Sequence, residues 1–336
     1  MTRLRLGACL SLTGRYARFG RQAADGLKAW QTLAGAEVDL RVEDDGSDKE
    51  RLASGLEQVA AECDLLLGPY STQLMREAGR VMSHVDKVLW NHGGSGDDVQ
   101  GRCPGRFVSV LAPTSRYAQP FVRTRVAEAP RATLWVVRGG GRFGRQVATG
   151  ALREASRLGL EAIEKDAHEE GWFDYPPELW DLFSVGTFED DVSIVNEAMS
   201  VSTPPTALCS VAAGVRDFDS MVEPSEGIYG IAQWFPGRVE RPELGPTERE
   251  FVAAYRRIAG SWPDYPAVQA GAAAVLAVHC AQIAGSVDPR ALWQAATSLS
   301  ATTLFGAFGV DAQTGAQVRH TPVLLRWRAG ELQLVA

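Results

Sequence analysis

The stretch Leu65-Leu66-Leu67-Gly68-Pro69 is a wholly apolar run that ends at a glycine and a proline. A short apolar run bounded by turn residues is typical of a strand buried on both faces of a parallel sheet. Apolar residues at helical spacing precede it over 52–59 and follow it over 74–85, and a further strand is expected at 88–90. Strands that alternate with helices at these intervals need right-handed crossovers, so we expect a parallel sheet with helices on both faces.

The same pattern extends outward from this stretch in both directions. Further strands are expected at 4–12, 38–42, 134–137, 160–163, 182–185, 207–211, 305–310 and 323–327. The strands from 134 onward begin a second unit of the same design. Long helical patterns over 251–258 and 267–283 then indicate that the chain returns to cover the first unit. We therefore predict an α/β protein with two Rossmann-like lobes built on parallel sheets, each lobe discontinuous in the sequence.

Composition and charge exclude several classes of function. The chain has 336 residues, enough for two substantial cores. Its formal net charge of -7 disfavours nucleic-acid binding, which requires a basic surface. No segment approaches the ~20 consecutive apolar residues of a membrane-spanning helix, so we expect no membrane insertion.

The beginning of the chain does not have the features of an export signal. Arg3 and Arg5 lead directly into a short apolar run, 6–12, and no stretch of ~7–15 apolar residues comes before a cleavage site. The five cysteines are an odd number without paired spacing, which favours reduced thiols. We expect a cytoplasmic protein; a periplasmic or extracellular location is the alternative if an export signal was removed.

A glycine-rich stretch offers a competing hypothesis. Gly139-Gly140-Gly141-Arg142-Phe143-Gly144 fits G-x-G-x-x-G after a predicted strand, and Glu164 or Asp166 follows about 20 residues later. This is the context of a dinucleotide site, so an NAD-dependent enzyme stays open as a third hypothesis, although the motif is frequent by chance. The five histidines are scattered without ligand spacing. We expect no metal, no cofactor and no catalytic residues.

Six short strings carry a resemblance to a known family. They lie in this order along the chain: 12–20, 43–48, 67–72, 92–95, 264–268 and 305–311. Each string is weak alone, but their collinear order resembles the branched-chain amino-acid-binding (Leu/Ile/Val-binding) family of type I periplasmic binding proteins. The likeness covers nearly the whole chain, and residues 164–178 fit it poorly.

The resemblance implies two lobes joined by three crossover strands, with a ligand in the cleft between them. It places the first lobe at 1–116 and 237–309 and the second at 117–236 and 310–336. The function implied is that of a solute-binding protein which closes on a small molecule and hands it to the permease of an ABC importer. A cytosolic ligand sensor that controls a regulatory protein is the alternative.

On the first lobe, the resemblance assigns ligand contacts to Phe19, Tyr70, Ser71, Thr72, Gly93, Gly94 and Ser95. In the family, hydroxyls and main-chain N–H groups of the third and fourth loops hold the ligand's carboxylate. Short hydroxyl side chains at helix N-termini suit this task, because they present donors and a favourable dipole to an anion. The alternative is that Ser71, Thr72 and Ser95 only cap helices.

On the second lobe, the resemblance assigns Phe143, Thr187, Phe188 and Ala213. Family members that bind amino acids have an acidic residue where Ala213 stands, and that residue holds the ligand's ammonium group. A buried ammonium group needs such a partner. We therefore expect a small carboxylate or related neutral compound with an apolar or aromatic body, unless Glu189 or Asp190 moves into the cleft and restores ammonium binding.

Overall fold

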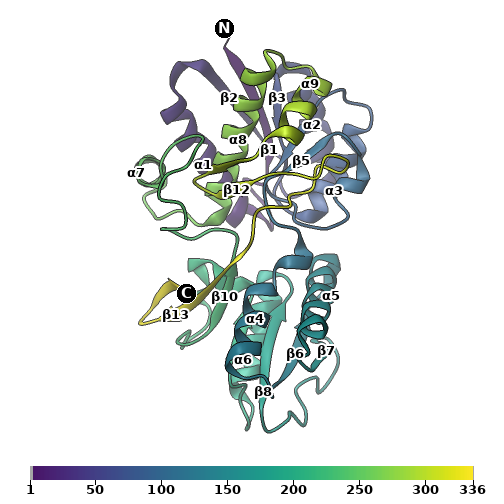
Figure 1. Ribbon diagram of the computed structural model, residues 1–336, viewed down its shortest axis with the longest axis vertical. Coiled ribbons are helices and arrows are strands. Elements are labelled where there is room, and N and C mark those ends of the chain that lie inside the picture. Colours follow the sequence, from purple (N-terminus) through teal and green to yellow (C-terminus); the bar gives the residue numbers. More distant parts are fainter. Residues whose placement is uncertain (1–2, 336) are drawn as a thin grey trace. The chain divides into compact units, whose positions relative to one another are not determined.

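The computed structural model describes residues 3–335, which form two compact units (Figure 1). Unit 1 contains the chain up to Pro113 together with Trp234–His320, and unit 2 contains Thr114–Gln233 together with the chain from Thr321. The chain therefore passes between the units after residues 113, 233 and 320, where the sequence placed the passages after 116, 236 and 309.

The third passage differs most from its predicted position, because residues 310–320 belong to unit 1. A turn in this segment packs on the last strand of the unit 1 sheet. The Ser109 amide donates to the Gly315 carbonyl at 3.0 Å, and the Gln317 side chain donates to the Val110 carbonyl at 3.1 Å. These contacts keep the segment with unit 1 until Thr321.

The sheet of unit 1 is parallel throughout. Its strand order is β2 (Val38–Asp44), β1 (Leu4–Leu10), β3 (Leu65–Leu67), β4 (Leu89–Asn91) and β5 (Phe107–Ser109). Side chains alternate between its two faces. Leu65 and Leu67 belong to one apolar cluster and Leu66 to another, so both faces of β3 are buried as predicted.

Helices cover both faces of this sheet. One cluster packs the sheet against α1 (Ala17–Ala34), α7 (Glu248–Ala259), α8 (Tyr265–Ala284) and α9 (Pro289–Ser298). The other packs it against α2 (Lys49–Glu62) and α3 (Thr72–Met82). The long helices near the end of the chain thus return to the first sheet, as expected. Helix α8 is long and apolar enough to cross a membrane by length and composition, but most of it is buried in the core of unit 1.

The sheet of unit 2 is mixed. Its order is β14 (Glu331–Leu334), β13 (Val323–Arg328), β10 (Tyr229–Ala232), β9 (Leu208–Ser210), β8 (Trp180–Val185), β6 (Thr133–Arg138) and β7 (Ala162–Asp166). The strands from β10 to β7 are parallel, whereas β13 and β14 are antiparallel. The prediction of parallel sheets is therefore corrected here. A two-residue turn at Ala329 and Gly330, both with positive φ, joins β13 to β14, and such a turn produces an antiparallel hairpin.

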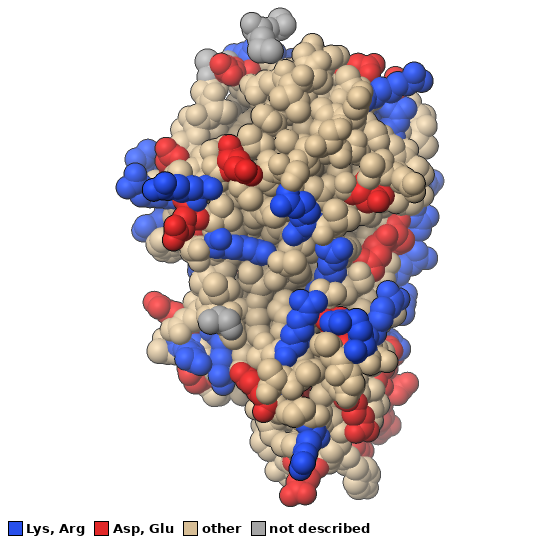
Figure 2. Space-filling view, in the orientation of Figure 1, with Lys and Arg blue, Asp and Glu red and all other residues tan. Residues whose placement is uncertain are grey.

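The remaining elements complete the two units. Unit 2 contains α4 (Gln119–Glu128), α5 (Gly141–Leu158) and α6 (Phe188–Ser200), and unit 1 contains a small hairpin of β11 (Ala301–Thr303) and β12 (Gly306–Phe308). The five cysteines are free and buried. On the face shown in Figure 2, basic and acidic side chains are interspersed over both units.

Candidate functional site

The predicted ligand residues of unit 1 lie in the loops that follow its parallel strands, except Phe19 and Thr72, which lie in the first turns of α1 and α3. Because the strands are parallel, the loops after β1, β2, β3 and β4 meet at one edge of the sheet, the carboxyl edge. The third and fourth loops touch directly, since the Ser71 amide donates to the Gly93 carbonyl at 3.1 Å. A side chain at Gly93 would lie 2.4 Å from the Pro69 carbonyl oxygen, so only glycine allows this approach.

Asn91, the last residue of β4, organises the fourth loop. Its side-chain oxygen accepts the amides of Gly93 and Gly94 at 3.2 and 2.8 Å. Its side-chain nitrogen donates to the Gly94 carbonyl at 2.7 Å and to the Ser109 hydroxyl at 2.8 Å. The amides of Gly93 and Gly94, which were expected to face a ligand, are therefore already engaged. Sequence reasoning missed Asn91, although a polar residue that ends a buried strand was a usable signal.

The three hydroxyl residues of unit 1 differ in role. Ser71 is the N-cap of α3, because its hydroxyl accepts the Leu74 amide at 3.2 Å. The Thr72 hydroxyl accepts the Gly96 amide at 3.1 Å and so ties the two loops together. The Ser95 side chain is 7% exposed, and its hydroxyl makes no hydrogen bond within residues 3–335. Of the three, Ser95 is best placed to donate to a ligand.

Ser71 also has an unusual backbone. Its φ of 101° lies in a region that side chains other than glycine rarely adopt. Such strain persists only where the surrounding structure holds it, and it concentrates at binding sites. The hydrogen bonds of Ser71 to Gly93 and Leu74 keep its backbone in this conformation.

Aromatic side chains border the same loops. The rings of Phe19 and Tyr70 stack at 4.9 Å with an interplanar angle of 16°. The Tyr70 hydroxyl lies 3.3 Å from the hydroxyl of Tyr265, the first residue of α8. Tyr265 was not predicted as a site residue, because its neighbour Tyr70 is 195 positions away in the sequence. Together these rings form an aromatic border to the carboxyl edge of unit 1.

Three buried polar side chains lie near these loops: Ser11, Asp45 and His92. The Ser11 hydroxyl donates to the Asp45 carboxylate at 2.6 Å, and both residues are fully buried. His92 is also fully buried, and burial lowers its pKa from 6.5 to about 4. The imidazole is therefore neutral at neutral pH and supplies no positive charge to a ligand.

In unit 2, Thr187 and Asp190 form a capping box at the start of α6. The Thr187 hydroxyl accepts the Asp190 amide at 3.1 Å, and the Asp190 carboxylate accepts the Thr187 amide at 3.0 Å. The same carboxylate oxygen accepts the Gly140 amide at 3.1 Å. Asp190 is therefore held in place by the backbone of two loops. Glu189 beside it is exposed.

This arrangement disfavours a dinucleotide at the glycine-rich stretch. A pyrophosphate would need the amides at the start of α5, but the Asp190 carboxylate already accepts the Gly140 amide and lies against Gly139. The carboxylates expected to hold a ribose are also engaged, because Arg138 pairs with Glu164 at 2.6 Å and with Asp166 at 2.8 Å. The glycines make room for Asp190: a Cβ at Gly139 would lie 2.5 Å from its carboxylate oxygen.

The other predicted residues of unit 2 are largely buried. Ala213 is 0% exposed, and its carbonyl accepts the Trp327 indole N–H at 3.0 Å. Phe143 packs edge-on against Tyr117 at 5.7 Å, and Phe188 begins α6 at 9% exposed. Ala213 thus fits into the packing of unit 2 next to β13, and its carbonyl is not available to a ligand.

A carboxylate that the sequence did not single out lies beside Ala213. Asp191 accepts the Ala212 amide at 2.9 Å and the Ser184 hydroxyl at 2.7 Å. It is 1% exposed, and burial raises its pKa from 3.8 to about 6. Its hydrogen bonds join α6 to the ends of β8 and β9, which is a structural role.

Comparison with known proteins identifies the family. The model of the periplasmic binding protein family matches residues 3–331. A leucine-binding protein from Thermotoga maritima MSB8 has 13% sequence identity and a TM-score of 0.81, over 99% of this chain and 98% of that chain. An ABC transporter substrate-binding protein from Desulfitobacterium hafniense in complex with Leu has 16% identity and a TM-score of 0.82, over 99% of both chains.

A third solved structure holds an aromatic acid. It is a solute-binding protein of an ABC transporter from Rhodopseudomonas palustris BisB5 in complex with 3,4-dihydroxybenzoic acid, with 14% identity and a TM-score of 0.79 over 98% of this chain and 94% of that chain. No curated protein sequence matches the chain. The family model spans nearly all of the sequence, and these structures share its type I fold. The chain belongs to the periplasmic binding protein family.

Proposed function

We propose that this chain is the substrate-binding protein of an ABC importer, and that its two units close on a small carboxylate with an apolar or aromatic body. The proposed ligand class rests on the acidic residues of unit 2 and on the hydrogen bonds that their carboxylates already accept. Ala213 stands where the family resemblance places an acid, while Asp190 and Asp191 are held by backbone amides. Ala213 has no acidic side chain, and both oxygens of the buried Asp191 accept hydrogen bonds, so neither residue offers an ammonium group a partner. Asp190 accepts its amides on one oxygen, Oδ2, and an ammonium group at its other oxygen is the alternative that the titration of amino acids tests.

The relatives support the choice of a carboxylate. Proteins of the same fold from Rhodopseudomonas palustris were solved with 4-hydroxybenzoate and with benzoate. Others were solved with leucine or isoleucine. Both groups of ligands carry a carboxylate, and they differ in the ammonium group. The Ser95 hydroxyl in the unit 1 loops suits the carboxylate that the ligands share, and the stacked rings of Phe19 and Tyr70 suit an apolar or aromatic body.

Amino acids and their deaminated analogues should separate clearly in calorimetric titration. We expect 4-methylpentanoate and 3-phenylpropanoate to bind ~100-fold or more tightly than leucine and phenylalanine, because an unpaired buried ammonium group costs several kcal/mol. Benzoate extends the series toward aromatic acids. Glu189→Gln is the matched variant, and it should leave acid binding unchanged. Tight binding of leucine without binding of 4-methylpentanoate would overturn the proposed ligand class, and its loss in Glu189→Gln would identify Glu189 as the partner of the ammonium group.

Closure of the units gives a second test. The radius of gyration from small-angle scattering should fall when the acid that binds best is added to saturation, because a hinge motion brings two rigid bodies together. The same titration with an analogue that does not bind is the control. An unchanged profile at saturation, in a protein that is open without ligand, would contradict closure.

A cytosolic sensor of the same ligand class is the second candidate. The five free, buried cysteines favour it, because disulfides are rare in reducing compartments. The family name instead points to the periplasm. A sensor would bind a regulatory protein in place of a permease, and fractionation of the source cells separates the two candidates.

A further inference from the structure

A buried glutamine lies where the chain leaves unit 1 for the last time. Gln317 is 2% exposed and comes three residues before His320, the last residue of the unit. Its side-chain oxygen accepts the amides of Arg319 and His320 at 2.8 and 3.1 Å. These two bonds fix the backbone up to His320, so a hinge motion at this third passage begins after it.

The side-chain nitrogen of Gln317 binds the body of unit 1. It donates to the carbonyls of Val110 and Ala307 at 3.1 and 3.4 Å. Val110 follows β5, the edge strand of the sheet, closely, and Ala307 lies in β12. Gln317 therefore binds four backbone groups: two amides at the passage and two carbonyls in the body of the unit.

The segment around Gln317 is closely packed on unit 1. Gly315 has a φ of +72°, and a Cβ there would lie 1.9 Å from the Phe107 carbonyl oxygen, so only glycine allows this turn to approach β5. The ring of His320 stacks on the ring of Phe305 at 4.2 Å with an interplanar angle of 8°. These contacts and the bonds of Gln317 hold residues 315–320 in one position relative to β5.

The edge of the sheet also connects Gln317 to the fourth ligand loop. The Val110 amide donates to the Asn91 carbonyl at 3.0 Å, while the Val110 carbonyl accepts the Gln317 side chain. The Asn91 side chain in turn accepts the amides of Gly93 and Gly94. A chain of three hydrogen bonds thus runs from the fourth loop to Gln317 at the end of unit 1.

We infer that Gln317 is a positioning residue, which fixes the end of unit 1 at the third passage and couples it to the fourth loop through Val110 and Asn91. The inference rests on the proposed function, because a fixed hinge position matters to a protein whose units close. In a close-packed interior, displacement of one member of such a chain strains the next. Loss of the bonds at Gln317 should therefore loosen the fourth loop.

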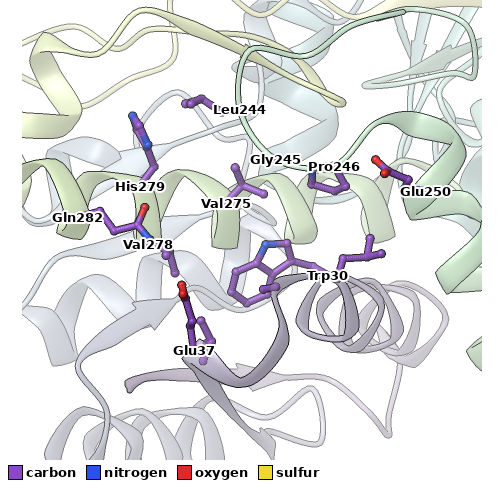
Figure 3. A pocket seen from close by; sticks show the side chains of 13 residues that line it. Trp30, Glu37, Leu244, Gly245, Pro246, Glu250, Val275, Val278, His279 and Gln282 are labelled. Carbon is purple, nitrogen blue, oxygen red and sulfur yellow. The ribbon is translucent and has the colours of Figure 1, made fainter. Parts of the chain in front are cut away.

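Amide hydrogen exchange without ligand tests the coupling. Gln317→Met retains an unbranched side chain and removes all four hydrogen bonds. We expect the amides of Gly93 and Gly94 to exchange ~10-fold or more faster in this variant, although three hydrogen bonds separate them from position 317. The reference is the amide of Val275, in the middle of α8 beside the groove shown in Figure 3. Its exchange should change much less.

Gln317→Glu is the milder variant. Its carboxylate keeps an acceptor for the amides of Arg319 and His320, but it has no N–H for the Val110 carbonyl. The amides at the passage should therefore stay protected in Gln317→Glu, while those of Gly93 and Gly94 exchange faster. This variant separates the bonds at the passage from the link to the sheet.

Asp311→Ala is the matched control. The Asp311 carboxylate also accepts two amides, those of Gln313 and Thr314, but these bonds stay within the turn that precedes Gln317. Its loss should loosen this turn and leave the exchange of Gly94 within about twofold of the original chain.

Ligand affinity supplies the functional measurement. We expect Gln317→Met to weaken binding of 3-phenylpropanoate ~5-fold or more and Asp311→Ala to weaken it less than about twofold. If the original chain does not bind this acid, the proposed ligand class fails, and the exchange data still decide the coupling. Equal acceleration at Gly94 and Val275, equal acceleration of Gly94 in Asp311→Ala, or unchanged affinity for an acid that the original chain binds would overturn the inference.

Discussion

Replacing Thr72 and Ser95 together with alanine should weaken binding of the carboxylate ligand by ~10²–10⁴-fold. Each hydroxyl is expected to donate one charge-assisted hydrogen bond of ~1.5–3 kcal/mol, and each 1.4 kcal/mol is tenfold in affinity. Ser95 has no other hydrogen bond in the described chain, and Thr72 accepts the Gly96 amide while its own proton stays available to donate. Calorimetric titration with the acid that binds best measures the change.

Two single variants control this experiment. Thr72→Ser keeps the hydroxyl that accepts the Gly96 amide and should retain most of the affinity. Ser71→Ala removes the N-cap of α3 and should lower the free energy of unfolding by ~1 kcal/mol with a much smaller effect on binding. If the double variant instead loses stability as Ser71→Ala does and keeps its affinity, Thr72 and Ser95 are structural residues only.

The strands of this fold were predictable where they are buried on both faces. The wholly apolar run 65–67 matches β3, and the mainly apolar run 182–185 lies within β8. Such runs are typical of strands that are buried on both faces of a parallel sheet. Strand β7 begins two residues after its predicted start at 160 and extends to Asp166. It is an edge strand that carries Glu164 and Lys165, so its apolar signal was weak.

The roles of the polar residues were less predictable, because their partners come from distant positions. Ser71 and Thr187 follow local capping rules, which the sequence already raised for Ser71. Asp190 reaches Gly140, which is 50 residues away, and Asp191 reaches Ala212, which is 21 residues away. Which of three successive acids is exposed, caps a helix or is buried depends on the packing of α6 against β8 and β9.

Acidification should change the contributions of His92 to unit 1 and of Asp191 to unit 2 in opposite directions. In unit 1, the pKa of His92 is about 4 in the folded state and 6.5 ordinarily. Between these values the unfolded state binds more protons, so the free energy of unfolding falls as the pH falls, by about 3 kcal/mol in full. In unit 2, the pKa of Asp191 is about 6 when folded and 3.8 ordinarily. There the folded state binds more protons, so the free energy of unfolding rises by about 3 kcal/mol over the same fall in pH.

Measured on the whole chain, these opposite contributions partly cancel, so each unit has to be followed separately. Amide hydrogen exchange of peptides from each sheet, between pH 7 and pH 4, reports the local free energy of opening unit by unit. His92→Gln should remove most of the acid-dependent loss in unit 1 and leave unit 2 unchanged, and Asp191→Asn should remove the acid-dependent gain in unit 2. The test compares how steeply the free energy of opening changes with pH in the original chain and in each variant. Its absolute value is not compared, because either substitution in a buried site also lowers stability at every pH. If the free energy of opening of unit 1 changes with pH as steeply in His92→Gln as in the original chain, His92 is not the group that titrates.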